Sequence, residues 1–369
     1  MPPIKILVVD KSVVVRRLLS NLLDADAALE VVGTAPNGKI ALAKISQVNP
    51  DLIVLDLEKP EMEGLHTLVA IREKDKKIPV IMFSSLTKMG SSATLESLSL
   101  GATDYLSKPE NFNSNEVISA YVREQLITKI KIICQTSLMP NLAPREVAEK
   151  AQTISPEAPK HQSPFLSPPP AIKNIKSQVE IVAVGASTGG PNALETVLSA
   201  LPANFPVPIV IVQHMPPIFT KRLAERLAQK CQIRVEEGLT GGILAPGVAW
   251  IAPGDYHMLL ERQGFEVQIR TNQDPPENSC RPAVDVLFRS TAKIYGAGVL
   301  AVVLTGMGQD GLHGCEGIRE VGGQILVQDR ASSVVWGMPG SVANSGLADR
   351  VVSLEAMAGE IIDRVTNNK

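Results

Sequence analysis

The chain has 369 residues, which is enough for two domains of ordinary size and a linker. Its 36 basic and 38 acidic residues give a formal net charge of −2, so the composition provides no electrostatic footprint for nucleic acid or an anionic membrane. The N-terminal apolar stretch has about five residues, far fewer than the roughly 20 of a membrane span. We therefore expect a cytoplasmic protein with no nucleic-acid partner and no membrane insertion.

The four cysteines are far apart in the chain and show no C-x-x-C spacing. Neither a disulfide framework nor a zinc knuckle is indicated. We expect free, buried thiols at all four positions, which are Cys134, Cys231, Cys280 and Cys315.

The N-terminal third alternates short apolar runs with segments of helical periodicity. The predicted strands cover residues 6–9, 29–33, 51–56, 78–83 and 103–106, and helical patterns cover 12–23 and 41–48. Buried strands joined by helical crossovers predict a doubly wound parallel sheet, whose ligand crevice lies at the carboxyl ends of the strands.

Proline recurs and large apolar residues become scarce after about residue 136. From residue 179 the alternation resumes, with strands predicted at 208–214, 298–306 and 322–328 and an antiparallel excursion near 257–262 and 265–270. The predicted fold class is α/β, with two doubly wound parallel-sheet domains. The predicted boundaries are a first domain at 1–132, a Pro-rich linker at 133–176 and a second domain at 177–369.

Polar side chains follow several strands of the first domain. Asp10 and Asp56 end two predicted strands, Ser84 follows a third, and Lys108 stands before Pro109. A single aspartate at a strand end usually caps the following helix. Together, however, two carboxylates can hold Mg²⁺, while an ammonium and a hydroxyl can bind phosphoryl oxygens. The arrangement predicts a site that accepts a phosphoryl group on Asp56.

This joint arrangement resembles the receiver domain of two-component response regulators, over residues 4–130. The resemblance implies a flavodoxin-like fold, with Asp56 as the phosphorylated residue, Ser84 as the switch hydroxyl and Lys108 as the phosphate-binding lysine. Tyr105 corresponds to the aromatic residue that rotates on activation.

The resemblance also implies a Mg²⁺ site formed by Asp10, Asp56 and Glu58. The sequence departs from the family pattern here, because Lys11 occupies the position where a second consecutive acidic residue is expected. A positive charge within about 4 to 6 Å of the metal position weakens Mg²⁺ binding. Two interpretations stay open: Lys11 points to solvent, or its ammonium replaces part of the charge of the metal and the domain is poorly phosphorylated.

The second domain opens with an apolar strand that runs into V-G-A-S-T-G-G-P. A P-loop would need lysine after the glycines, and this sequence has Pro191 and Asn192 there. A dinucleotide-binding fingerprint needs another glycine spacing and an acidic residue about 20 positions later. The pattern favours a third interpretation, in which Ser187 is a nucleophile on a strand-to-helix turn whose backbone N–H groups suit an oxyanion.

A serine nucleophile needs a base, and His214 ends the next parallel strand. A histidine in that place is more often structural, but Asp310 follows a third buried strand and would reach the same sheet edge. Asp310 could instead cap the helix that begins near Gly311. A carboxylate that orients His214 is what a triad requires, so we predict a triad in the chain order Ser187, His214, Asp310.

Six separated motifs in this half, GASTGGP, QHMPP-x-F-T, IAPGD-x-HM, RPAVDVLF, TGMGQDG and WGMPG, resemble the chemotaxis protein-glutamate methylesterase (CheB) family. The resemblance implies Ser187 as nucleophile, His214 as general base and Asp310 as its orienter. Thr188 and Met307 match the part of the family that lines the oxyanion and substrate pocket. Two departures are Cys280, where histidine is often seen, and Gly340, where a basic residue is common.

The resemblance implies hydrolysis of glutamate γ-methyl esters on the cytoplasmic helices of methyl-accepting chemoreceptors, and deamidation of receptor glutamines. It also implies a chemotaxis-type sensor histidine kinase as partner, and a receiver that rests across the catalytic face until Asp56 is phosphorylated. No cofactor is expected for catalysis, and Mg²⁺ is expected only in the receiver. Two alternatives stay open: a small-molecule esterase or amidase, and a receiver-regulated binding module without turnover.

Overall fold

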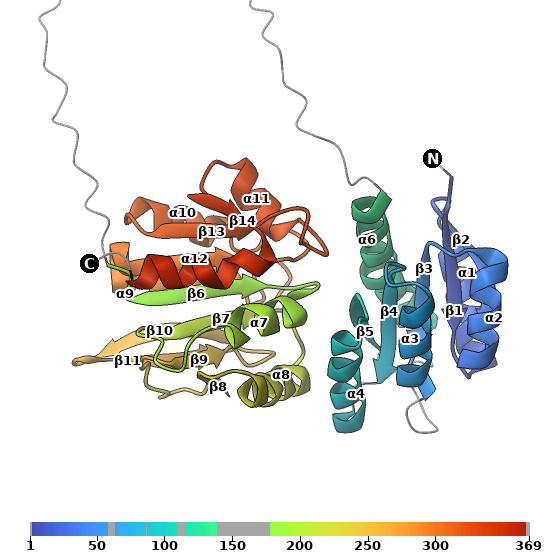
Figure 1. Cartoon of the computed structure of the whole chain (residues 1–369), viewed down its shortest axis with the longest axis horizontal. Helices are drawn as coiled ribbons and strands as arrows, with labels where there is room; N and C mark the ends of the chain where they lie inside the picture. The colour runs from blue at the N-terminus through green and yellow to red at the C-terminus, as the bar shows by residue number, and fades with distance from the viewer. Residues whose placement is uncertain (1, 58–62, 86, 109–114, 139–177, 367–369) are drawn as a thin grey trace, which may run out of the picture.

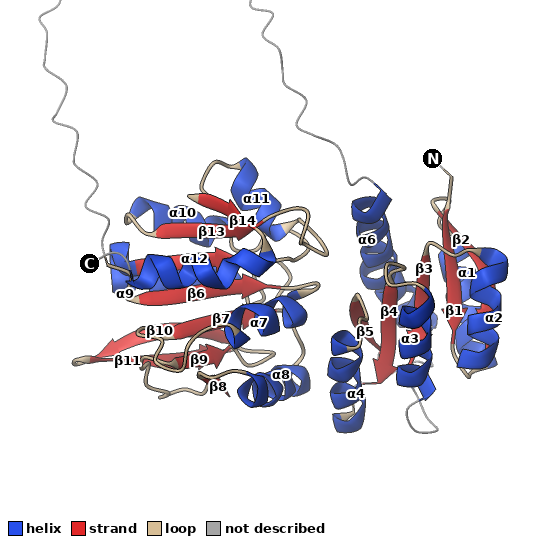
Figure 2. Cartoon of the chain, viewed as in Figure 1, coloured by secondary structure: helices blue, strands red, loops and turns tan. Residues whose placement is uncertain are grey.

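The structure is a computed structural model that describes residues 2–57, 63–85, 87–108, 115–138 and 178–366. It confirms the α/β class: each domain has one parallel sheet with helices on both sides (Figures 1 and 2). Among the helices of these ranges, none combines the length and the hydropathy that a membrane-spanning segment requires.

The first domain is a five-stranded parallel sheet in the order β2-β1-β3-β4-β5. Its strands are β1 (Ile4–Val9), β2 (Leu29–Ala35), β3 (Leu52–Asp56), β4 (Val80–Ser85) and β5 (Asp104–Lys108). The helices between them are α1 (Val13–Asp24), α2 (Gly38–Val48), α3 (Glu63–Lys74) and α4 (Lys88–Ser99). All five predicted strands are present.

Local sequence accounts for these elements. Every residue of β3 is buried, as an apolar strand covered on both faces requires. Three helices begin at residues whose side chains accept a hydrogen bond from a first-turn N–H: Ser12 before α1, Asn37 before α2 and Thr87 before α4. Each strand therefore ends at a defined loop, and these loops form one edge of the sheet.

The last helical region of the first domain is longer than predicted. It comprises α5 (Asn115–Tyr121), the π-helical turn η1 (Val122–Ile127) and α6 (Thr128–Leu138). Residues 133–138, predicted as linker, are helical because Ile130, Ile133 and Cys134 are buried in the core of the first domain. The rest of the predicted linker lies outside the described residues.

The second domain is a seven-stranded parallel sheet in the order β14-β13-β12-β6-β7-β9-β8. Its strands are β6 (Ile181–Ala186), β7 (Ile209–Gln213), β8 (Arg234–Glu237), β9 (Val248–Ile251), β12 (Val299–Val303), β13 (Gln324–Gln328) and β14 (Arg350–Val352). The predicted antiparallel excursion is the hairpin of β10 (His257–Gln263) and β11 (Glu266–Asn272).

Helices cover both faces of this sheet (Figure 1). One apolar layer contains α7 (Gly190–Ser199), α8 (Pro217–Lys230) and α12 (Leu354–Thr366). The other contains α9 (Val284–Tyr295), α10 (Leu312–Glu320) and α11 (Met338–Asn344), with the 3-10 turn η2 (Gly296–Gly298) before β12. The strand order reverses direction between β6 and β12, and that switch point is where ligands of such sheets bind.

Candidate active site

Three neighbouring strands carry the predicted catalytic residues to one edge of the second sheet. Ser187 follows β6, His214 follows β7 on one side of it, and Asp310 comes from the loop after β12 on the other side. Backbone hydrogen bonds continue past the strands: His214 donates to Ala186 at 3.2 Å, and Ser187 donates to Thr305 at 3.0 Å. Parallel register therefore brings the ends of β6 and β7 side by side, and the loop after β12 carries Asp310 to the same edge.

Ser187 lies on a tight strand-to-helix turn. Gly189 precedes α7 with φ +76°, a conformation that favours glycine, and Pro191 falls in the first helical turn, where its missing N–H costs nothing. The buried Gln213 side chain holds the turn, because its Nε2 donates to the Ser187 carbonyl at 2.9 Å. The half-buried Ser187 is thus presented at the start of a helix, at the positive end of its dipole.

His214 and Asp310 are directly bonded, with 2.8 Å between Nε2 of the imidazole and Oδ2 of the carboxylate. Nδ1 is therefore the ring nitrogen that is not bonded to Asp310. Within the described part of the chain no direct hydrogen bond joins Ser187 to His214. Burial alone lowers the pKa of His214, but the hydrogen bonds with Asp310 and Cys280 outweigh it and raise the pKa to about 10.

Asp310 does not cap the helix that follows it, so that alternative is wrong. Gly311 is the N-cap of α10 and makes no side-chain capping bond. Instead, Asp310 accepts hydrogen bonds from the backbone N–H groups of Val284 at 2.6 Å and Asp285 at 3.0 Å, at the start of α9. Burial raises the pKa of Asp310, and these bonds together with His214 reverse that effect and lower it.

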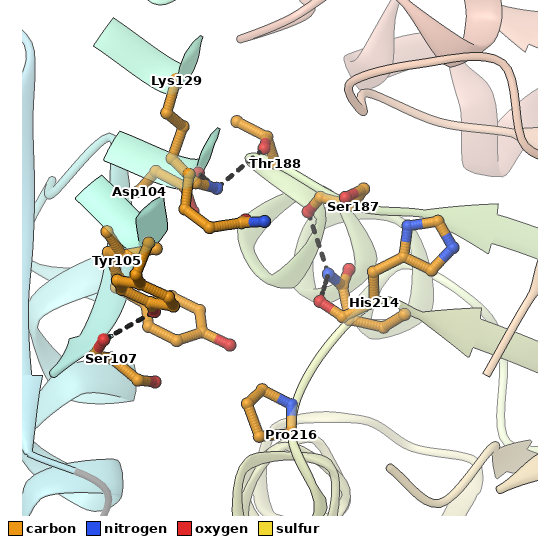
Figure 3. Close-up of a pocket in the computed structure, with 12 residues that line it drawn as sticks. Asp104, Tyr105, Ser107, Lys129, Ser187, Thr188, His214 and Pro216 are labelled. Atoms are coloured by element: carbon orange, nitrogen blue, oxygen red, sulfur yellow. Dashed lines mark hydrogen bonds and ion pairs between the residues drawn. The ribbon is translucent and has the colours of Figure 1, made fainter. Parts of the chain in front are cut away.

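A cavity of about 190 Å³ lies between the two domains, and Figure 3 shows the residues around it. Ser187, Thr188 and His214 form part of its wall on the side of the second domain. The opposite wall comes from β5, α5, η1 and α6 of the receiver domain. Pockets for drug-sized ligands usually have about 300–1,000 Å³, so this cavity is too small for a protein side chain together with the helix that carries it.

The two predicted pocket residues differ in position. Thr188 lines the cavity, and its hydroxyl receives a hydrogen bond from the Lys129 ammonium of the receiver domain at 3.2 Å. Asp104 forms an ion pair with the same ammonium. Met307 is not among the lining residues; it packs against the apolar cluster that joins Val335 to the receiver core.

Further contacts hold the first domain against the second. The rings of Tyr105 and Phe219 stack with centroids 4.8 Å apart and an interplanar angle of 13°. Asn192 donates to the Leu98 carbonyl at 2.8 Å. Tyr105, predicted as the switch aromatic, is thus an interface residue, and burial raises its pKa well above the usual value.

The receiver crevice contains the predicted carboxylates and lysine together. Asp10 follows β1 and Asp56 is the last residue of the neighbouring strand β3, and the Lys108 ammonium bonds to both carboxylates, at 3.1 Å and 2.7 Å. Ser84 is fully buried, and its hydroxyl is hydrogen-bonded to that of Thr94 at 2.7 Å. In this arrangement the Ser84 hydroxyl is therefore engaged by α4 rather than by the carboxylates.

Only part of the predicted Mg²⁺ site is described. Asp10, Asp56 and Lys11 line the same crevice, whereas Glu58 lies outside the described residues. Across those residues, no group of three or more His, Cys, Asp or Glu side chains is arranged to hold a metal ion. The two carboxylates fit an oxygen-ligated cation, and the charge of Lys11 in the same crevice opposes it.

All four cysteines are free, but only two of them are fully buried. Cys134 and Cys315 are buried as predicted, whereas Cys231 and Cys280 are half-buried, so the prediction was wrong for that pair. Cys280 lies beside the His214 imidazole. At the other departure, a Cβ on Gly340 would lie 2.9 Å from the Trp336 ring, so a larger residue would require that ring to move.

Sequence reasoning missed three residues of this site. Lys129 and Gln213 line the cavity, and Asp285 is bonded to the loop that carries Asp310. Gln213 adjoins His214 and Asp285 belongs to the quoted motif RPAVD, so their positions in the sequence could have indicated both residues. Nothing in the sequence indicates Lys129, because its contact with the second domain depends on how two separate domains dock.

The fold and the site define a hydrolase with an α/β catalytic domain fused to a response regulator receiver domain. A family model for CheB methylesterase matches residues 182–361, and a model for the response regulator receiver domain matches residues 6–121.

The similar proteins agree on the family. The chain is 55% identical to a protein-glutamate methylesterase/protein-glutamine glutaminase of Trichodesmium erythraeum, over 99% of this chain and 100% of that protein. It is 46% identical to the protein of the same name from Nocardioides sp., over 100% of this chain and 97% of that one. The crystal structure of the Thermotoga maritima CheB methylesterase catalytic domain is 42% identical, with a TM-score of 0.50, and covers 51% of this chain and 99% of that chain. The chain therefore belongs to the protein-glutamate methylesterase/protein-glutamine glutaminase family.

Proposed function

We propose that the protein hydrolyses glutamate γ-methyl esters on methyl-accepting chemoreceptors, and deamidates receptor glutamines, through an acyl-enzyme on Ser187. The observation that carries the proposal is the 2.8 Å bond between His214 and Asp310 at the strand end next to Ser187. A buried carboxylate that orients an imidazole beside a serine is the arrangement that acyl transfer needs. Because the proposed substrate is a cytoplasmic receptor segment, we expect the enzyme to act in the cytoplasm.

The proposed reaction begins with attack of Ser187 Oγ on the γ-carbonyl carbon of the substrate. Nδ1 of His214 takes the hydroxyl proton, because Nε2 is bonded to Asp310. The protonated imidazole then gives the proton to the leaving methoxy group, and methanol departs. Water attacks the acyl-enzyme with His214 again as base, which releases the glutamate side chain and restores Ser187. From an amide substrate the leaving molecule is ammonia.

The oxyanion of each tetrahedral intermediate would form beside the turn at the start of α7. Backbone N–H groups and the helix dipole favour negative charge there, and one such donor typically contributes about 2.7 to 4 kcal/mol to the transition state. We assign Thr188 to this pocket. For Met307, which packs outside the cavity in this arrangement, the pocket role requires the receiver domain to move.

The test is release of methanol from methylated receptor membranes. Wild type should release methanol, Ser187→Ala should release none above background, and Ser199→Ala, at the surface end of α7, should behave as wild type. Equal release by Ser187→Ala and wild type would refute the proposal. Turnover of simple esters that exceeds that of receptor would favour the small-molecule esterase instead, and no turnover of either would favour the binding module.

We further propose that the receiver domain inhibits catalysis in the arrangement described here and is released by phosphorylation of Asp56. Support comes from the cavity, because receiver residues cover the side of it that a substrate helix would have to approach. A chemotaxis-type sensor histidine kinase would supply the phosphoryl group. Asp10 and Asp56 would hold the Mg²⁺, which neutralises phosphoryl oxygens when bound, and Lys108 would bind the transferred group. Acetyl phosphate should raise methanol release by wild type and leave Asp56→Asn unchanged.

A further inference from the structure

Two helices of the catalytic domain begin next to each other without caps of their own. Ala283 is the N-cap of α9 and Gly311 the N-cap of α10, and neither makes a side-chain capping bond. The first N–H groups of a helix have no partner within the helix, and they carry its positive dipole end. Val284, Asp285, Gly311 and Gly314 are buried at these two helix starts, so their N–H groups need acceptors from elsewhere.

Each helix is capped by a carboxylate of the other. Asp310, directly before α10, accepts from the N–H groups of Val284 and Asp285 at the start of α9, at 2.6 Å and 3.0 Å. Asp285, in the first turn of α9, accepts from the N–H groups of Gly311 and Gly314 at the start of α10, at 3.0 Å and 2.6 Å. The Asp310 carboxylate thus caps α9, and the Asp285 carboxylate caps α10.

Asn278 connects the two carboxylates. Its Nδ2 donates to Asp285 Oδ2 and to Asp310 Oδ1, both at 2.9 Å. Asn278 has φ +53°, in a tight turn closed by reciprocal backbone bonds between Glu277 and Cys280. A non-glycine residue rarely adopts this conformation, and here it places the amide between the two acids.

We propose that Asp285, together with Asn278, is a positioning residue that holds the Asp310 carboxylate in the orientation that His214 requires. The inference rests on the proposed triad and adds to it. Oδ2 of Asp310 is hydrogen-bonded to both the Val284 N–H and the His214 imidazole. A small rotation of the carboxylate would therefore lengthen the bond to His214. The Asp285 bonds to the Asp310 loop and the Asn278 bond to Oδ1 oppose that rotation.

The bond between Asp310 and His214 also affects the basicity of the imidazole, because the carboxylate stabilises its protonated form. Asp285 itself is fully buried, and burial and the neighbouring Asp310 carboxylate raise its pKa, whereas hydrogen bonds from Gly314 and Asn278 oppose that rise. A displaced Asp310 carboxylate would stabilise the protonated imidazole less. Loss of the Asp285 contacts should therefore make His214 a weaker base, which is an effect that a purely structural residue would not have.

The test is Asp285→Asn in the full-length protein, with methylated receptor membranes as substrate. The new amide Nδ2 would face the Nδ2 of Asn278, so two donors oppose each other and the connection is lost. We expect kcat to fall about ten- to a hundredfold with KM nearly unchanged, as for a catalytic group displaced by a fraction of an ångström. The acid limb of the pH profile should move to lower pH, and the downfield ring N–H resonance of His214 should shift.

A second variant is needed because Asp285→Asn could lose activity through a folding defect. Asn278→Gly removes the amide and keeps the positive φ, so it should also lower kcat without loss of folded protein. Glu277→Gln is the matched control in the same turn: it removes a surface ion pair with Arg289 and should keep the wild-type kcat. The inference would be overturned if Asp285→Asn and Asn278→Gly both kept the wild-type kcat, the wild-type pH profile and the wild-type ring N–H resonance of His214. An inactive wild type, or an active Ser187→Ala, would instead refute the proposed function.

Discussion

The stacked pair of Tyr105 and Phe219 gives a quantitative test of receiver inhibition. The substitution is Tyr105→Leu, which keeps an apolar side chain at the interface and removes the ring contact at 4.8 Å. An aromatic pair contributes about 0.5 to 1.5 kcal/mol beyond the area that it buries. That stabilisation exists only in the proposed closed arrangement, in which the receiver domain covers Ser187 and His214. Its loss therefore shifts the equilibrium towards an open arrangement, in which the receiver domain has moved away.

The size of the shift follows from the Boltzmann factor. With RT of about 0.59 kcal/mol, a loss of 0.5 to 1.5 kcal/mol multiplies the open-to-closed ratio by about two to twelve. If the closed form predominates, the basal rate of ester hydrolysis should rise by the same factor. Full activation by acetyl phosphate should reach the same maximum as in wild type, because the catalytic residues are unchanged.

The assay is methanol release without a phosphodonor, combined with the radius of gyration in solution. Tyr295→Leu, at the end of α9, is the matched control and should leave both quantities at the wild-type value. A basal rate for Tyr105→Leu within error of wild type, with an unchanged radius of gyration, would refute the idea that this stack holds the receiver in the inhibitory position.

Three further predictions concern the proposed triad, the receiver crevice and the turn that carries Ser187. Asp310→Asn removes the carboxylate that raises the pKa of His214, so the acid limb of the activity profile should move to lower pH while the rate falls about 10⁴-fold. The sign follows because a general base must be neutral, and activity therefore rises as pH increases through the pKa of His214. Lys11→Asp should increase Mg²⁺-dependent phosphoryl uptake from acetyl phosphate, because it replaces a cation in the crevice by a carboxylate. Gly189→Ala should lower the free energy of unfolding by at least about 1 to 2 kcal/mol in urea titrations, since φ is +76° and the new Cβ would lie 2.6 Å from Val334.

Each of these has a contrary outcome. An acid limb that stays in place in Asp310→Asn would mean that another group sets the pKa of His214. Equal, robust labelling of wild type and Lys11→Asp would mean that the lysine does not oppose the metal. Gly359→Ala, inside α12 with open space around the position, is the control for Gly189→Ala and should be neutral or stabilising.

The sequence by itself determined the α/β class, all five strands of the first sheet and strands β6, β7, β12 and β13 of the second, and with them the sheet edge at which the proposed catalytic residues lie. It did not predict β8, β9 or β14. Apolar runs bounded by glycine and polar residues fix where a parallel strand ends, and all such ends lie on one side of the sheet. Hence Ser187, His214 and Asp310 could be placed at one edge before any coordinates. The same rule placed Asp10 and Asp56 in the receiver crevice.

Only the tertiary structure decided how those side chains are held. Periodicity does not reveal that Asp310 caps α9 instead of α10, or that Nε2 of His214 is the bonded nitrogen. Those outcomes depend on how helices from distant parts of the chain approach each other, and hydrogen bonds between them carry no local sequence signal. The docking of Lys129 on Thr188 depends in the same way on the fit of two domain surfaces, which each domain's own pattern leaves undetermined.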